Sequence, residues 1–214
     1  MTATPPPTPS TTAPLYAPES GSGVTPSQTV GPFFANCLLR DDMRAHNVLV
    51  TPDTEGTRIR IVGYVYDGDG TPLPDALVEI WQANAAGRYN HPEDAGDAAL
   101  DPTFKGWGRS GTDTDGTFRF DTIKPGRAPY DDDVMQAPHI CVAVFARGLL
   151  NHLYTRIYFS DEPSNEQDPV LQRVPPERRA TLIARHAGVE PGGRTMYTFN
   201  VVLQGQNETA FFNI

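Results

Sequence analysis

The sequence has few cysteines, no basic cluster and no long hydrophobic run, and each shortage excludes a class of protein. Two cysteines, Cys37 and Cys141, are too few for the disulfide framework of a small secreted domain. The net charge is −9, so binding to nucleic acid or to an anionic membrane surface is not expected. No segment approaches the roughly 18 apolar residues that a membrane-spanning helix requires.

The first residues also lack the features of a targeting signal. Residues 1–24 contain six prolines and a single charge, Glu19, and the first basic residue is Arg40. A secretory signal needs a charged start and an apolar run, and both are missing. We interpret residues 1–24 as a disordered leader and expect a cytoplasmic protein.

Glycine and proline are abundant, at 19 and 21 residues, which favours a turn-rich β protein. Short runs of strand-like alternation, several of them closed by turn signals, recur along the chain. They predict a β-sandwich at 58–214, preceded by an N-terminal arm at 25–57. The expected strands are 58–66, 77–81, 117–120, 140–147, 153–159, 197–203 and 209–212.

One helix is expected, from Pro176 to His186. Proline suits the first turn of a helix, and Gly188 stands where a C-terminal cap belongs.

His139 and Cys141 are two residues apart on a predicted strand, so both project from the same face. Both residue types bind metals, and the pair could hold zinc or copper. Alternatively, Cys141 packs as a small apolar residue while His139 is hydrogen-bonded within the sheet. The same face carries Arg147, which could line a polar cleft or a subunit contact, or form only a surface ion pair. The opposite face is predicted to be core: Ile140, Val142, Val144 and Ala146.

Several motifs together resemble the intradiol ring-cleaving dioxygenases. They are LVEIWQANAAGRY at 77–89, GWGR at 106–109, TIKPG at 122–126 and APHI at 137–140. Three further segments are similar to the alpha chains of two-chain members of this family: TPSQTVGPF at 25–33, FARG at 145–148 and TAFF at 209–212.

The resemblance implies a β-sandwich, a heteromer of alpha and beta chains, and a non-haem ferric iron held by two tyrosines and two histidines. Tyr89 matches the first tyrosine ligand and His139 the first histidine. The second tyrosine position is Ala128, with Tyr130 nearby but out of register, and the second histidine position is Cys141. These positions are therefore vestigial, and Fe(III) is expected in the partner beta subunit rather than in this chain.

By the same resemblance, the chain shapes the substrate pocket of a catalytic beta subunit, which cleaves protocatechuate with O2. The resemblance also implies a higher alpha–beta oligomer, with the arm at 25–57 contributing to the subunit interface. Gly31 and Pro32 suit a wall of this pocket, because glycine allows close backbone approach and proline stiffens it. Arg147 would supply positive charge towards the substrate carboxylate.

Two other functions remain open on the sequence. The chain could be a self-sufficient dioxygenase that recruits Tyr130 and Cys141 as unusual ligands. It could also be a sandwich-fold binding module without enzymatic connection.

Overall fold

The computed structural model describes residues 28–31, 37–39, 44–94, 96–131 and 133–213. The predicted leader, 1–24, lies outside these residues, as do residues 25–27, 32–36 and 40–43 of the predicted arm. Among the residues described, no helix is long and apolar enough to cross a membrane.

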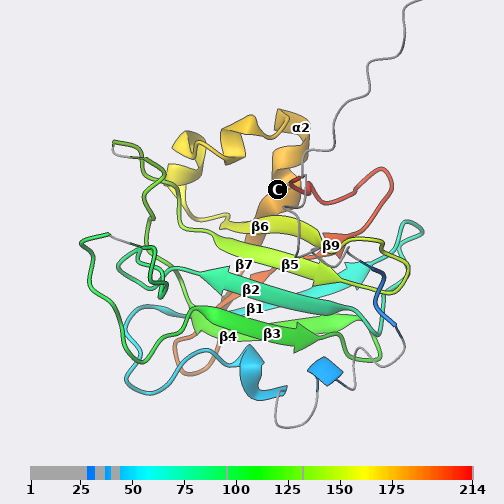
Figure 1. The fold of residues 1–214 in the computed structure, drawn as a ribbon, viewed down its shortest axis with the longest axis horizontal. Helices are drawn as coiled ribbons and strands as arrows, with labels where there is room; N and C mark the ends of the chain where they lie inside the picture. Colours follow the sequence, from blue (N-terminus) through cyan, green and yellow to red (C-terminus); the bar gives the residue numbers. More distant parts are fainter. Residues whose placement is uncertain (1–27, 32–36, 40–43, 95, 132, 214) are drawn as a thin grey trace, which may run out of the picture.

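In the part of the chain that the structure describes, eight strands follow one another in the order β3-β2-β5-β6-β7-β8-β1-β4, and a ninth, β9, pairs with β1. Figure 1 shows β3, β2, β5 and β6 as one layer, with β1 and β7 partly behind it. The predicted all-β sandwich is confirmed. The first layer contains β2 (Leu77–Gln82), β3 (Trp107–Gly111), β5 (Ile140–Phe145) and β6 (Leu153–Phe159). The remaining strands are β1 (Arg58–Tyr66), β4 (Thr117–Ile123), β7 (Ile183–Val189), β8 (Thr195–Thr198) and β9 (Val201–Val202).

The main core lies between the layers and follows the period-two pattern of the strands. In β5, Ile140, Val142 and Val144 are buried while the residues between them are only partly buried. Ala146 beyond the strand is buried too, so the predicted core face is confirmed. The other strands contribute Ile59, Ile61, Val65, Val78, Ile80, Phe118, Phe120, Ile157, Phe159 and Ala184.

The helix predicted at 176–186 is wrong in its second half. The short helix α2 spans Pro176–Arg179, and a 3-10 turn, η4 (Ala180–Leu182), leads directly into β7. The backbone from Ile183 pairs with β6 and then with β8, so sheet hydrogen bonds override the local helical pattern. Gly188, with φ of 109°, lies at an irregularity in the β7–β8 ladder rather than at a helix cap.

Other boundaries differ by shorter distances. The strand predicted at 197–203 is divided into β8 and β9, and the one at 209–212 is reduced to a single bridge between Phe212 and Tyr154. Strand β3 was not predicted. The remaining short helices are the 3-10 turns η1 (Arg44–Asn47), η2 (Pro163–Gln167) and η3 (Leu171–Arg173).

A second, smaller core lies under the helical segment that follows β6. Its buried members include Tyr158, Leu171 and Leu182. Asp168, with no exposed surface, accepts hydrogen bonds from the Tyr158 hydroxyl and from the backbone of Ala137. This carboxylate therefore ties the helical segment to the chain just before β5, where the candidate site begins.

Candidate functional site

Tyr89 is positioned by a tight turn directly after β2. The side chain of Asn84 accepts hydrogen bonds from the backbone N–H groups of Ala86 and Arg88, at 2.9 and 3.0 Å. Gly87 has a φ of 85°, and a Cβ there would lie 1.9 Å from the carbonyl oxygen of Arg127. Only glycine fits this position, and its close packing brings the loop of Tyr89 against the loop that follows β4.

That second loop contains the position of the missing tyrosine. Ala128 is buried, with 1% of its surface exposed, and has no side chain that could act as a ligand. Tyr130 is 38% exposed, and the guanidinium of Arg173 lies 5.7 Å from the centre of its ring. Tyr130 therefore belongs to a surface contact.

His139 and Tyr89 meet at the start of β5, and no imidazole nitrogen of His139 is free. The ring Nδ1 lies 2.8 Å from the carbonyl oxygen of Ala137, which can only accept, so Nδ1 carries the proton. The ring Nε2 is then the acceptor, and the Tyr89 hydroxyl donates to it at 3.2 Å. Trp81 stacks against the Tyr89 ring, with the centroids 5.8 Å apart.

Arg156 lies opposite Cys141 in the β5–β6 ladder. Its Nη1 donates to the side-chain oxygen of Gln136 at 2.8 Å and to the Tyr158 hydroxyl at 3.4 Å. The Tyr158 hydroxyl in turn donates to Asp168 at 2.9 Å. An arginine and its hydrogen-bonded partners therefore adjoin the vestigial ligand positions.

Burial shifts the pKa values of His139, Tyr89 and Cys141 in the direction that favours the neutral form of each side chain. Desolvation, together with the positive charge of Arg156, lowers the pKa of His139 from 6.5 to about 4. Desolvation raises the pKa of the Tyr89 hydroxyl and that of the Cys141 thiol. The imidazole, phenol and thiol are thus neutral at pH 7, and Arg156 carries the only charge among these four side chains.

These residues do not fit a ferric ion. The ion prefers anionic phenolate and neutral imidazole ligands, and here one phenolate position is Ala128 and one imidazole position is a protonated thiol. Tyr130 does not replace the missing phenolate, because its ring lies under Arg173. Elsewhere in the described part of the chain, no three His, Cys, Asp or Glu side chains are grouped to hold a metal.

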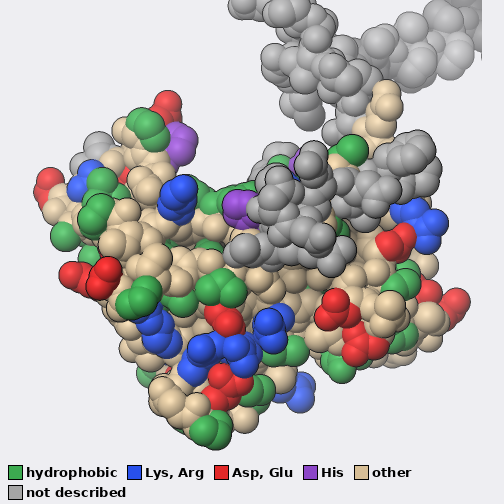
Figure 2. Space-filling model, turned by 90° about the horizontal axis from the view of Figure 1, so that it is seen from below, with side chains coloured by type: hydrophobic (Ala, Val, Ile, Leu, Met, Phe, Trp, Pro, Cys, Tyr) green, Lys and Arg blue, Asp and Glu red, His purple; other side chains and the backbone are tan. Residues whose placement is uncertain are grey.

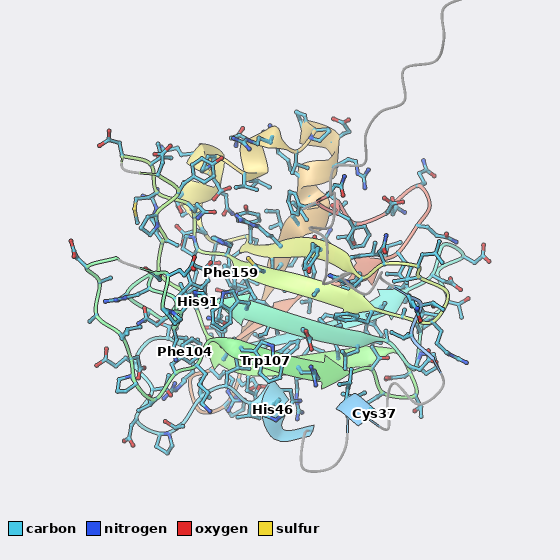
Figure 3. The ribbon with its side chains drawn as sticks, viewed as in Figure 1. Cys37, His46, His91, Phe104, Trp107 and Phe159 are labelled. Carbon is cyan, nitrogen blue, oxygen red and sulfur yellow. The ribbon has the colours of Figure 1, made fainter. Side chains whose placement is uncertain are left out.

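Of the remaining histidines, His91 and His186 are exposed, whereas His46 and His152 are partly buried. Figure 3 shows His46 beside Trp107, where the two rings are 5.2 Å apart, and His91 in the loop after β2. On the face shown in Figure 2, Lys and Arg side chains lie beside Asp and Glu side chains.

The other predicted site residues lie at the far end of β5. The Thr29 hydroxyl accepts a hydrogen bond from the backbone N–H of Gly148 at 3.2 Å, which brings the segment of Gly31 close to the turn of Arg147. Gly31 is exposed, and Pro32 lies outside the described residues. The Arg147 side chain is 67% exposed and forms an ion pair with Asp75. The structure thus brings Thr29, two residues before Gly31, to the turn that contains Arg147.

Between these segments lies a cavity of about 240 Å³. Its wall is mostly apolar, with Val30, Phe145, Ala146 and Leu149, and also includes Gln28, Asn151 and His152.

Sequence reasoning missed Arg156 and Gln136. Arg156 stands within the predicted strand 153–159, and antiparallel pairing with the strand of Cys141 would have placed it on the face of His139. An arginine between the mostly apolar neighbours of that strand was the available signal. Gln136 gave none, because its role depends on the path of the loop that follows Ala128.

The chain is similar to characterised dioxygenase subunits. It is 44% identical to the protocatechuate 3,4-dioxygenase alpha chain of Burkholderia cepacia, over 89% of this chain and 97% of the relative. It is 40% identical to the beta chain from the same organism, over 76% of this chain and 71% of the relative.

A solved structure and a family pattern agree with this similarity. The dioxygenase domain of a carbohydrate-binding fusion protein from Streptomyces sp. SirexAA-E matches with a TM-score of 0.58 and 30% identity. The match covers 87% of this chain and 99% of that domain. Residues 30–205 match the family described as Dioxygenase (Dioxygenase_C). The chain therefore belongs to the intradiol dioxygenase family.

Proposed function

We propose that this chain is the alpha subunit of a protocatechuate 3,4-dioxygenase, which cleaves protocatechuate with O2 to 3-carboxy-cis,cis-muconate. The observation that carries the proposal is a complete intradiol fold whose ligand positions contain Ala128 and Cys141. Only the Tyr89–His139 pair is retained, and its two polar groups are hydrogen-bonded to each other. The 44% identity to a chain named as an alpha chain supports the same assignment.

The family uses non-haem ferric iron, and in our proposal this iron belongs to a catalytic beta subunit. The 40% identity to a beta chain supports a partner with the same fold, so that the two subunits assemble as related sandwiches. We further propose that several alpha–beta pairs form a larger oligomer and that the complex is cytoplasmic.

In the complex, Gly31, Pro32 and Arg147 would form part of the partner's substrate pocket. Arg147 suits a carboxylate ligand, because its guanidinium already holds the carboxylate of Asp75 while most of the side chain remains exposed. Arg147 lies in the turn that follows β5, and the length of this strand, at about 3.3 Å per residue, separates it from His139, so it cannot act at the vestigial site. Gly31 has no atom within 4 Å of a Cβ built there, and a partner or substrate can approach its backbone closely.

The experiment compares the isolated chain with the complex formed on co-expression with its catalytic partner. Iron is measured by elemental analysis and oxygen uptake is measured with protocatechuate. The isolated chain should contain less than stoichiometric iron and consume no oxygen. The complex should contain iron and consume oxygen. Stoichiometric ferric iron with turnover in the isolated chain would contradict the proposal and favour a self-sufficient enzyme.

A further inference from the structure

The vestigial site contains a fixed positive charge. The β5–β6 register places Arg156 directly across from Cys141, and its guanidinium acts electrostatically on His139 and Tyr89 as well. The charge therefore lies beside three of the four former ligand positions, Tyr89, His139 and Cys141. A guanidinium does not lose its proton under physiological conditions.

The guanidinium is held by two hydrogen-bond partners, both of which accept from its Nη1. Gln136 accepts from it at 2.8 Å, and Tyr158 links it to the buried carboxylate of Asp168. Asp168 also accepts hydrogen bonds from the backbone of Ala137, Val170 and Leu171. Because this carboxylate is fully used, it cannot turn to compensate a second cation.

We propose that Arg156 closes the vestigial site to metal ions by placing a permanent positive charge beside the former ligands. This rests on the proposed function, in which the chain takes no iron, and goes beyond it: restoring the missing ligands does not restore iron binding while Arg156 remains. In the restored chain two phenolates offset only part of the charge of a ferric ion, and the positive charge of Arg156 beside it adds repulsion that a low dielectric strengthens. Iron would also have to displace the Tyr89 hydroxyl from His139 Nε2.

The test starts from a ligand-restored chain that carries Ala128→Tyr and Cys141→His. Arg156→Gln is then added, because glutamine removes the charge and can still donate to Gln136. A matched control adds Arg109→Gln instead, since Arg109 is also partly buried and paired, with Glu79 on β2. Arg156→Lys, in the same background, retains the charge with a different shape.

Each purified chain is titrated with ferric nitrilotriacetate, and bound iron is measured by elemental analysis and by the visible phenolate-to-iron absorbance. We expect Arg156→Gln to raise the iron affinity at least about tenfold over the ligand-restored chain. Arg109→Gln and Arg156→Lys should leave the affinity low. Arg156→Met provides a second neutral variant in case the glutamine variant does not fold.

Equal iron affinity with and without Arg156 would overturn the proposal, as would a gain in the lysine variant equal to that in the glutamine variant. These outcomes are distinct from failure of the proposed function, which would appear as stoichiometric iron in the unmodified chain. The unmodified chain is therefore titrated in the same series.

Discussion

Neutral His139 should make the stability of the chain depend on pH. Its pKa is lowered from 6.5 to about 4 in the folded state, chiefly by burial and then by the charge of Arg156. Asp168 and the hydrogen bond to Ala137 act in the opposite direction but do not prevail. Between these two pH values the unfolded chain binds a proton that the folded chain does not bind. The contribution of neutral His139 to the unfolding free energy is therefore fully present above pH 6.5 and is lost as the pH decreases towards 4.

The magnitude follows from the shift. A difference of about 2.5 pKa units, at 1.36 kcal/mol per unit, corresponds to about 3 kcal/mol of unfolding free energy. His139 is 2% exposed, so solvent screening reduces this value little. A loss of this size is a large fraction of the roughly 5–15 kcal/mol that stabilises an ordinary domain.

The assay is urea unfolding at several pH values from 7.5 to 4.5, for the parent chain, His139→Gln and the control His91→Gln. His91 is exposed, so its replacement should leave the pH profile unchanged. The variant His139→Gln should lose little stability over this pH range, although it is less stable than the parent chain at pH 7.5. The carboxylates with lowered pKa values, Asp121 and Asp161 among them, titrate mainly below this range. Identical pH profiles for the parent chain and His139→Gln, or an NMR titration of His139 centred near pH 6.5, would refute the reasoning.

Three further predictions concern catalysis and assembly. Cys141→His alone should create no oxygen uptake, because residue 128 still lacks a phenolate; robust turnover would show that Tyr130 can serve as a ligand. Deletion of residues 2–20 should leave assembly with the beta chain intact, since proline- and threonine-rich sequence gains little by ordering, and loss of co-purification would make the leader an interface arm. In the assembled complex, Arg147→Ala should reduce kcat/KM on protocatechuate by about ten- to a hundredfold, and much less on unsubstituted catechol. Equal losses on both substrates, or none, would leave Arg147 as the surface partner of Asp75.

The sandwich could be predicted from the sequence because apolar strand-like runs separated by turn signals recur along it, and the longest strand, β1, alternates strictly between buried and partly buried residues. The strands at 58–66 and 153–159 have the bounds that the pattern indicates. β3 was missed because its sequence, WGRSG, has low strand propensity. Its glycines pack closely: a Cβ on Gly108 would lie 2.9 Å from the carbonyl oxygen of His46, and one on Gly111 would lie 2.4 Å from the end of the Leu39 side chain. Such contacts come from distant parts of the chain, and local pattern does not reveal them.

The candidate site was predictable where one motif carries one ligand, as at Tyr89 and His139, and at the gaps Ala128 and Cys141. What the sequence could not show is how the remaining polar groups are satisfied. That depends on the register between β5 and β6 and on the loop of Gln136, which are properties of tertiary pairing.

Buried imidazole and phenol groups pose a general problem, because they are costly when left without hydrogen-bond partners in a low dielectric. In this chain the Tyr89 hydroxyl and His139 satisfy each other, and Arg156 is satisfied by Gln136 and Tyr158. Within the described residues, none of these side chains has a buried nitrogen or oxygen without a hydrogen-bond partner. Tyr89 and His139 therefore have a structural use that does not depend on a metal, and their presence alone is not a sign of residual catalysis.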